Sequence, residues 1–197
     1  MKKIGMISLG CDKNRVDSEK VLYKLRLAGY DFTSNIADAD IIIINTCAFI
    51  ESAKKESIDV ILDVAEIKKR KQIKIIVIGC LAERYASLIR DQLPEVDVFG
   101  GLGTYDDIVS MIETGNGIFM SDNKEPILQK QRLITTPQHY AYLKIADGCD
   151  NFCSYCAIPF IRGRYRSYGE ESLIDEAKML VENGVNELII VAQDTVR

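Results

Sequence analysis

Short apolar runs alternate with amphipathic stretches along the first half of the chain. The apolar runs cover residues 4–9, 41–44, 73–78 and, more briefly, 96–99, and they are typical of buried parallel strands. Amphipathic helices are predicted over residues 16–28, 53–69, 82–93 and 105–113. In the first of these, the lysines and Arg26 are expected to face solvent. This alternation predicts a parallel-sheet α/β domain, Rossmann-like, with helices on both faces.

Residues 115–139 interrupt the pattern with glycines, prolines and mixed polar residues, which indicates a linker that can hold a short hairpin. A strand at 140–146, a helix at 170–183 and a strand at 187–192 are predicted after it. We therefore divide the chain into an N-terminal domain (1–114), a linker (115–139) and the incomplete start of a second domain (140–197). One strand–helix unit and a second strand cannot close a barrel, so this second domain is expected to be truncated.

The composition is that of a globular protein, with 47% hydrophobic and 27% charged residues. A net charge of −4 argues against direct nucleic-acid binding, which favours a basic surface. The N-terminal apolar run is too short for a signal peptide, and no later run is long enough to span a membrane. These features predict a soluble cytoplasmic protein without membrane contact. In a reducing compartment, six cysteines indicate metal or redox chemistry better than disulfides.

Three cysteines form the pattern C-x3-C-x2-C at Cys149, Cys153 and Cys156, in a loop directly after a predicted strand. Three protein ligands on a four-iron cluster leave one iron open, where S-adenosylmethionine (SAM) can chelate. Tyr155 stands where an aromatic ring can stack near the adenine of SAM. The alternative is a zinc knuckle, but zinc prefers four ligands and His139 lies before the strand.

The other cysteines, Cys11, Cys47 and Cys80, are far apart in sequence, yet each falls just past the carboxyl end of a predicted parallel strand. Ligand sites in open α/β sheets form at that edge, so we expect the three thiols to converge on a second cluster. Gly10 and Gly79 each precede a cysteine and permit close backbone approach. The alternative is three buried core cysteines that pack as small hydrophobic residues.

Three arginines at alternate positions, Arg162, Arg164 and Arg166, follow the C-x3-C-x2-C pattern. Guanidinium groups suit carboxylates, including that of SAM or of a carboxylate substrate. A solvated charged edge is an equally good interpretation of this spacing.

With the cysteines placed, the chain resembles the methylthiotransferase family of radical SAM enzymes. The segments that carry this resemblance are residues 8–14 (SLGCDKN), 45–50 (NTCAFI), 79–81 (GCL) and 142–159, and together they lie along nearly the whole chain. Residues 16–19, 162–167 and 191–195 resemble the RimO type, which modifies ribosomal protein uS12. The resemblance implies an N-terminal domain with an auxiliary cluster, followed by the start of a radical SAM (β/α) barrel.

The resemblance also implies the activity: transfer of a methylthio group to the β-carbon of an aspartate in uS12. Two [4Fe-4S] clusters and SAM are the implied cofactors, and no catalytic residue beyond the cluster ligands is assigned. One SAM would supply the methyl group, and reductive cleavage of a second would start the attack on the substrate carbon. The implied partners are uS12 or the small ribosomal subunit and an electron donor, although this fragment alone is expected to lack turnover.

Two alternatives remain open at this stage, a methylthiotransferase acting on transfer-RNA adenosine and a non-catalytic iron–sulfur or zinc module. One departure from the radical SAM pattern also matters. A Gly-Gly-Glu segment commonly ends the second strand and binds SAM, whereas Ala192, Gln193 and Asp194 stand there in this chain. A SAM contact by Gln193 or Asp194 is therefore a hypothesis.

Overall fold

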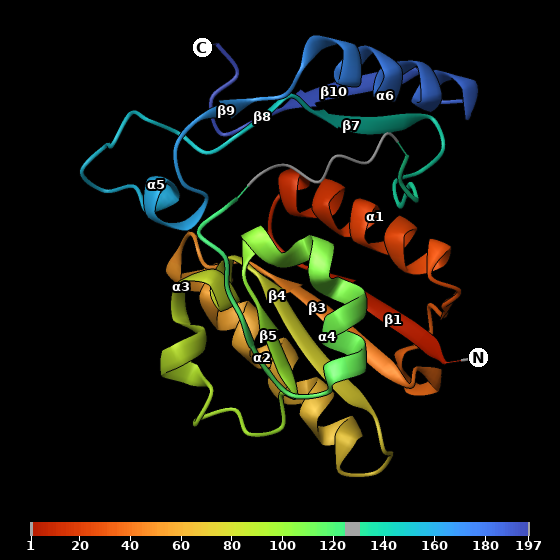
Figure 1. Ribbon diagram of the computed structural model, residues 1–197, viewed down its shortest axis with the longest axis vertical. Coiled ribbons are helices and arrows are strands. Elements are labelled where there is room, and N and C mark those ends of the chain that lie inside the picture. Colours follow the sequence, from red (N-terminus) through yellow and green to blue (C-terminus); the bar gives the residue numbers. More distant parts are fainter. Residues whose placement is uncertain (1, 125–130, 197) are drawn as a thin grey trace.

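The larger part of the protein is a six-stranded sheet in which every neighbouring pair of strands is parallel (Figure 1). It is seen in a computed structural model that describes residues 2–124 and 131–196. The strand order is β2-β1-β3-β4-β5-β6. In chain order the strands are β1 (Lys3–Ser8), β2 (Asp31–Phe32), β3 (Ile41–Thr46), β4 (Lys74–Gly79), β5 (Val98–Gly100) and β6 (Gly117–Phe119). The predicted α/β fold is confirmed.

Helices cover both faces of the sheet. Helices α1 (Asp12–Leu27) and α4 (Ile108–Thr114) lie on one face, and α2 (Glu51–Lys68) and α3 (Cys80–Ile89) lie on the other (Figure 1). Successive side chains of a strand point to opposite faces, so Ile41 and Ile43 pack with α1 and α4, whereas Ile42 and Ile44 pack with α2 and α3. This double burial explains why β3 is a continuous isoleucine run.

The element boundaries differ from the predicted ones where local geometry decides them. Helix α1 begins four residues early, at Asp12, because Cys11 adopts the extended conformation of an N-cap. A 3-10 helix, η2 (Leu102–Asp107), precedes α4, and another, η1 (Ile36–Asp38), follows β2. Strand β6 lies inside the predicted linker and pairs in parallel with β5. Strand β6 was not predicted, because a three-residue strand is too short to show a period. Residues 115–124 and 131–139 do not form the expected hairpin, and residues 125–130 lie outside the described part of the chain.

The second unit begins with β7 (Tyr140–Lys144), which pairs in parallel with β10 (Glu187–Val191). Helix α6 (Glu170–Glu182) connects them and packs on β7 through Ala141 and Leu180. The predicted order of strand, helix and strand is therefore present. Between β7 and α6 lie the short antiparallel pair β8 (Ala146–Asp147) and β9 (Arg166–Ser167), and helix α5 (Ile158–Ile161). Figure 1 shows this unit lying over α1.

The junction between the two units is a layer of buried charges on α1. Lys20 is only 4% exposed and pairs with Glu176 of α6, with 3.4 Å between Nζ and Oε2, so the expectation that it faces solvent is wrong. Hydrophobic periodicity could not show this, because a second unit covers the polar face of the helix. The layer, hereafter the junction network, contains the carboxylates of Asp17, Glu19, Asp147 and Glu176 and the cations of Lys20, Arg132, Lys144 and Arg162.

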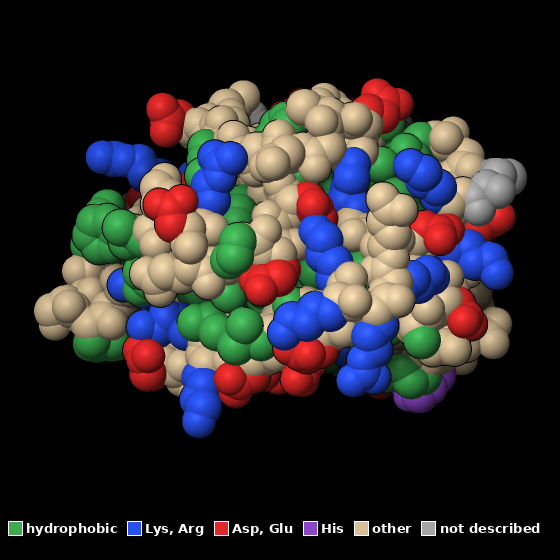
Figure 2. Space-filling model, turned by 90° about the horizontal axis from the view of Figure 1, so that it is seen from below, with side chains coloured by type: hydrophobic (Ala, Val, Ile, Leu, Met, Phe, Trp, Pro, Cys, Tyr) green, Lys and Arg blue, Asp and Glu red, His purple; other side chains and the backbone are tan. Residues whose placement is uncertain are grey.

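Charges of both signs are interspersed on the surface seen from below in Figure 2, where Lys and Arg side chains alternate with Asp and Glu. This face therefore carries no extended patch of one sign, in keeping with the small net charge of −4. Within residues 2–124 and 131–196, no helix is long and apolar enough to cross a membrane.

We predict that Ile43→Ala lowers the free energy of unfolding by about 2–5 kcal/mol, because Ile43 is fully buried at the centre of the sheet. Urea denaturation followed by circular dichroism measures this change. Leu27→Ala is the control, since Leu27 is 67% exposed at the end of α1 and its truncation should cost less than about 0.5 kcal/mol. Equal losses in the two variants would contradict this account of the core.

Candidate functional site

The first cysteine set, Cys11, Cys47 and Cys80, lies at the carboxyl edge of the parallel sheet. Cys11 follows β1 as the N-cap of α1, Cys47 comes directly after β3, and Cys80 follows β4 as the first residue of α3. These three strands are neighbours in the sheet, so the cysteines emerge side by side. Cys11 is exposed, whereas Cys47 and Cys80 are buried.

Two glycines with left-handed backbone conformation allow this close approach. At Gly10 (φ +83°), a Cβ atom would lie 2.5 Å from Cβ and 2.9 Å from Sγ of Cys47. At Gly79 (φ +94°), a Cβ atom would lie 2.2 Å from Oδ1 of Asn45. A side chain at either position would therefore clash as well as strain the backbone. The loop after β1 is in contact with the loop after β3.

Electrostatics at the first set are dominated by burial. Burial raises the pKa of the Cys47 thiol, and it raises the pKa of Cys80 to about 11. The Arg162 guanidinium opposes the shift at Cys80, while the neighbouring thiols Cys47 and Cys11 add to it. Arg162 is thus the cation that favours the anionic form of Cys47 and Cys80.

A polar scaffold, not anticipated from the sequence, holds the first set in place. Asn14 donates from Nδ2 to the carbonyl oxygens of Leu9 (3.1 Å) and Thr46 (2.9 Å), and its Oδ1 lies 3.9 Å from Sγ of Cys80. The hydroxyl of Ser57 clamps the Cys47 backbone, accepting from its N–H at 3.1 Å and donating to its carbonyl at 2.9 Å. Asn14 lies in the segment SLGCDKN, residues 8–14, which carries part of the resemblance. Nothing in the sequence distinguishes Ser57 from other serines in the predicted helices.

Two buried polar atoms around the first set have no hydrogen-bond partner among the described residues: Oδ1 of Asn45 and the hydroxyl of Tyr105. Burial is the largest influence on the pKa of Tyr105 and raises it. The charges of Asp17, Arg162 and Cys80, which lie near this residue, have smaller effects. A buried donor without a partner costs free energy unless something accepts from it.

In the described part of the chain, no three His, Cys, Asp or Glu side chains are grouped around a point where one metal ion would bind. Thiolates that hold an iron–sulfur cluster bind different irons, so they stand farther apart than the ligands of a single ion. Three thiols are the donor type that a cluster needs. Gly10, where a Cβ atom would clash with Cys47, keeps the space beside that thiol open.

The second cysteine set, Cys149, Cys153 and Cys156, lies on the loop between β8 and α5. Cys149 is buried, Cys156 half-buried and Cys153 exposed. The preceding Gly148 has φ +75°, and a Cβ atom there would lie 2.1 Å from the carbonyl oxygen of Arg164. As at Gly10 and Gly79, a glycine with positive φ thus directly precedes the cysteine.

The chain after β10 holds the second loop from the other side. The N–H of Gly148 donates to Oε1 of Gln193 at 3.0 Å, and Asn151 donates from Nδ2 to Oδ2 of Asp194 at 3.1 Å. Two of the three residues that stand in place of the Gly-Gly-Glu pattern are thus in contact with the cysteine loop itself. Their contact with SAM stays a prediction.

Exposed aromatic rings surround the second set. Phe152, which has a left-handed backbone (φ +46°), packs edge-to-face on Phe160 with ring centroids 6.4 Å apart. Tyr155 is 87% exposed, and the charge of Cys153 and a hydrogen bond to it raise the pKa of Tyr155. Its ring is accessible for the predicted stacking on adenine, which no contact in the structure tests.

Comparison with known proteins assigns the first half of the chain to a family. The family described as "Uncharacterized protein family UPF0004" matches residues 3–101, which include the first cysteine set. The chain belongs to this family.

Close relatives of this UPF0004 chain have the name "Ribosomal protein uS12 methylthiotransferase RimO". The relative from Clostridium tetani is 50% identical over 99% of the chain, that from Thermoanaerobacter sp. 46% over 100%, and that from Acetivibrio thermocellus 47% over 98%. The predicted resemblance is confirmed. The chain spans slightly less than half of these relatives, 45%, 46% and 45% of their lengths respectively.

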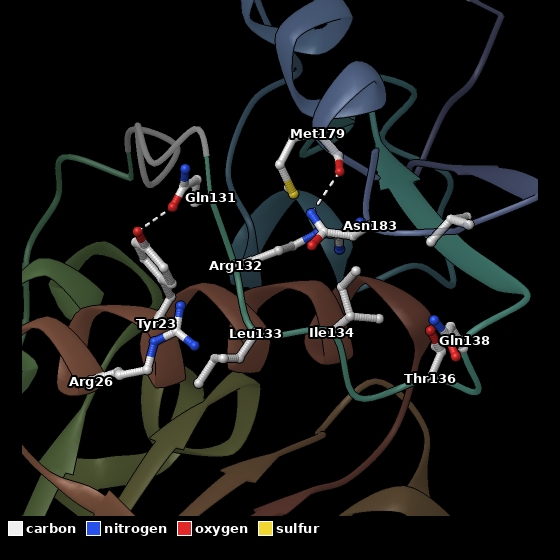
Figure 3. Close-up of a pocket in the computed structure, with 11 residues that line it drawn as sticks. Tyr23, Arg26, Gln131, Arg132, Leu133, Ile134, Thr136, Gln138, Met179 and Asn183 are labelled. Atoms are coloured by element: carbon white, nitrogen blue, oxygen red, sulfur yellow. Dashed lines mark hydrogen bonds between the residues drawn. The ribbon is translucent and has the colours of Figure 1, made fainter. Parts of the chain in front are cut away.

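A cavity of about 430 Å³ lies elsewhere in the UPF0004 chain, between α1, residues 131–138 and the end of α6 (Figure 3). Tyr23 of α1 donates to Gln131 on one side, and Asn183 donates to the Met179 carbonyl at 2.7 Å on another. Tyr23 is twelve residues after Cys11, about 18 Å along the same helix. The cavity is therefore separate from the first cysteine set.

We predict that Gly10→Ala prevents metal loading at the first set of the UPF0004 chain, because its methyl group would occupy the space of the Cys47 side chain. Gly29→Ala is a matched control: Gly29 has nearly the same φ (+85°) but nothing within 4 Å of the added Cβ. Because φ is nearly equal at the two positions, both substitutions should cause similar backbone strain. A loss of iron confined to Gly10→Ala therefore isolates the effect of the clash. Iron per chain after anaerobic reconstitution measures it, and equal loading in the two variants would refute the assignment.

Proposed function

We propose that this chain is the cluster-binding part of a radical SAM methylthiotransferase that modifies an aspartate of ribosomal protein uS12. Cys11, Cys47 and Cys80 hold an auxiliary [4Fe-4S] cluster, and the second set holds the [4Fe-4S] cluster that binds SAM. The main observation behind this proposal is that the chain has two separate sets of three cysteines, one at the edge of the sheet and one on the loop after β8. The names of the relatives support the choice of reaction and substrate.

The donor sets fit this role. Each set supplies three thiols, and a four-iron cluster so held would keep one iron free for an outside ligand. At the second set, the cluster would supply the electron needed to cleave SAM. At the first set, Gly10 makes room beside Cys47, and the Tyr105 hydroxyl is available to donate. At the second, the exposed Cys153 and half-buried Cys156 leave the loop open to a ligand.

The protein's own residues orient and shield the two sites. Asn14 and Ser57 fix the backbone on which the first thiols stand. Gln193 and Asp194 fix the second loop, and exposed Tyr155 offers a ring for the adenine of SAM. A hydrogen on an unactivated carbon is not acidic, so a radical, and not a side-chain base, is needed to remove it from the β-carbon.

The partners follow from the reaction. The substrate is uS12, free or in the small ribosomal subunit, and a separate electron donor reduces the second cluster. Ribosomes are cytoplasmic, and we place the activity there. The interspersed surface charges of Figure 2 and the net charge of −4 favour a protein substrate over transfer RNA.

We predict about eight irons with matching sulfide per chain after anaerobic reconstitution, as two four-iron clusters require. SAM should change the EPR spectrum of the reduced protein, because it binds the open iron of the second cluster. Cys153→Ala should halve the iron and abolish the response to SAM, whereas Cys47→Ala should halve the iron and keep the response. Zinc in place of iron, without sulfide, would overturn the proposal in favour of a structural metal module.

The substrate is tested in cells by replacing Cys153 with Ala in the chromosomal gene. Mass spectrometry of uS12 should show loss of the methylthio group, and transfer-RNA adenosines should keep theirs. Reintroducing the wild-type gene should restore the modification of uS12. The reverse pattern, modified uS12 with altered transfer RNA, would assign the chain to the other substrate.

A further inference from the structure

Arg162 lies between the two cysteine sets and is connected to each through one neighbouring residue. It follows the second set as the C-cap of α5, and the carbonyl oxygen of the next residue, Gly163, accepts from the N–H of Cys149 at 3.2 Å. Its side chain turns the other way, into the first set, and donates to Oδ1 of Asn14. The same oxygen is 3.9 Å from Sγ of Cys80. The expectation of a solvated charged edge is wrong at this position, since Arg162 is 2% exposed.

The guanidinium is held rigidly by carboxylates. It donates from Nη1 to Oδ2 of Asp17 at 3.1 Å and to Oδ2 of Asp147 at 3.0 Å. Both carboxylates bind the same nitrogen, Nη1, and the planar guanidinium fixes the direction of Nη2 relative to it. Nη2 donates to Oδ1 of Asn14, the oxygen that also lies 3.9 Å from Sγ of Cys80.

Lys144 provides an internal comparison. Its ammonium pairs with the same two carboxylates, Asp17 at 2.6 Å and Asp147 at 2.7 Å, and it also lies over the ring of Tyr168. Together Lys144, Arg162 and the two carboxylates form a neutral group. Arg162 is the cation of this group that lies on the side of the first set, where it acts on the charge of Cys47 and Cys80.

We propose that Arg162 is a positioning residue that neutralises negative charge at the first cysteine set and raises the reduction potential of the cluster bound there. The inference rests on the proposed function, since it requires that cluster. Reduction adds one negative charge to a buried site, and a nearby fixed cation stabilises the reduced form. Arg162 lies in the segment after the second set. The reduction potential of the first cluster is therefore raised only when the two units are docked.

The test uses the whole chain with Cys153→Ala and Cys156→Ala, which leaves the first cluster alone. Both replaced residues are at least partly exposed, so the fold should tolerate the changes. The midpoint potential is measured by redox titration with EPR detection. Arg162→Gln should shift it to more negative values, Arg162→Lys should keep it near that of the background protein, and Lys144→Gln should shift it less than Arg162→Gln.

Asp147→Asn is the second variant, needed if Arg162→Gln fails to load. It removes a negative charge from the same group without adding bulk, and it should move the midpoint potential in the opposite direction, to more positive values. An unchanged potential in a loaded Arg162→Gln protein, or in Asp147→Asn if the former does not load, overturns the inference. Failure of the proposed function is distinct from this: the background protein would then contain no iron and sulfide.

Discussion

The buried charges on α1 determine how the two cysteine sets are placed. Cys11, Asn14 and Asp17 follow one another at three-residue spacing and therefore lie along one side of the helix. The first two contribute to the first set, and Asp17 binds Lys144 and Arg162 of the second unit. A buried ion pair adds little net stability, but removing one partner typically costs about 3–5 kcal/mol. What the junction network supplies is registry, because a displaced second unit would leave charges buried without partners.

The same turn brings cysteines to both sites. Gly10, Gly79 and Gly148 each end or follow a strand, have a positive φ, and stand immediately before a cysteine. In all three, a Cβ atom would lie within about 2.5 Å of a neighbouring atom, which no side chain tolerates. The chain thus turns sharply at the strand end and presents the thiol directly. Cys47 has no such glycine before it, and Ser57 holds its backbone instead.

Much of this arrangement could be predicted from the sequence. Buried parallel strands are recognisable because both faces are covered, and the place of a cysteine after such a strand is enough to bring Cys11, Cys47 and Cys80 to one edge. Strand β6 was missed because three residues carry no period. Lys20 and Arg162 were misjudged for another reason. Their burial depends on contacts across the junction, with Glu176 and Asp17, that no local pattern encodes.

Burial also explains why the first set depends on a cation. Metal ligation requires thiolates, yet an apolar surrounding favours the protonated thiol, as the raised pKa of Cys47 and Cys80 shows. The N-terminal domain supplies the thiols and the amide of Asn14, whereas the cation that opposes this effect of burial comes from the second unit, as Arg162. If the first set holds the proposed cluster, its site at the sheet edge is complete only when the second unit is docked, although all of its thiols belong to the first unit.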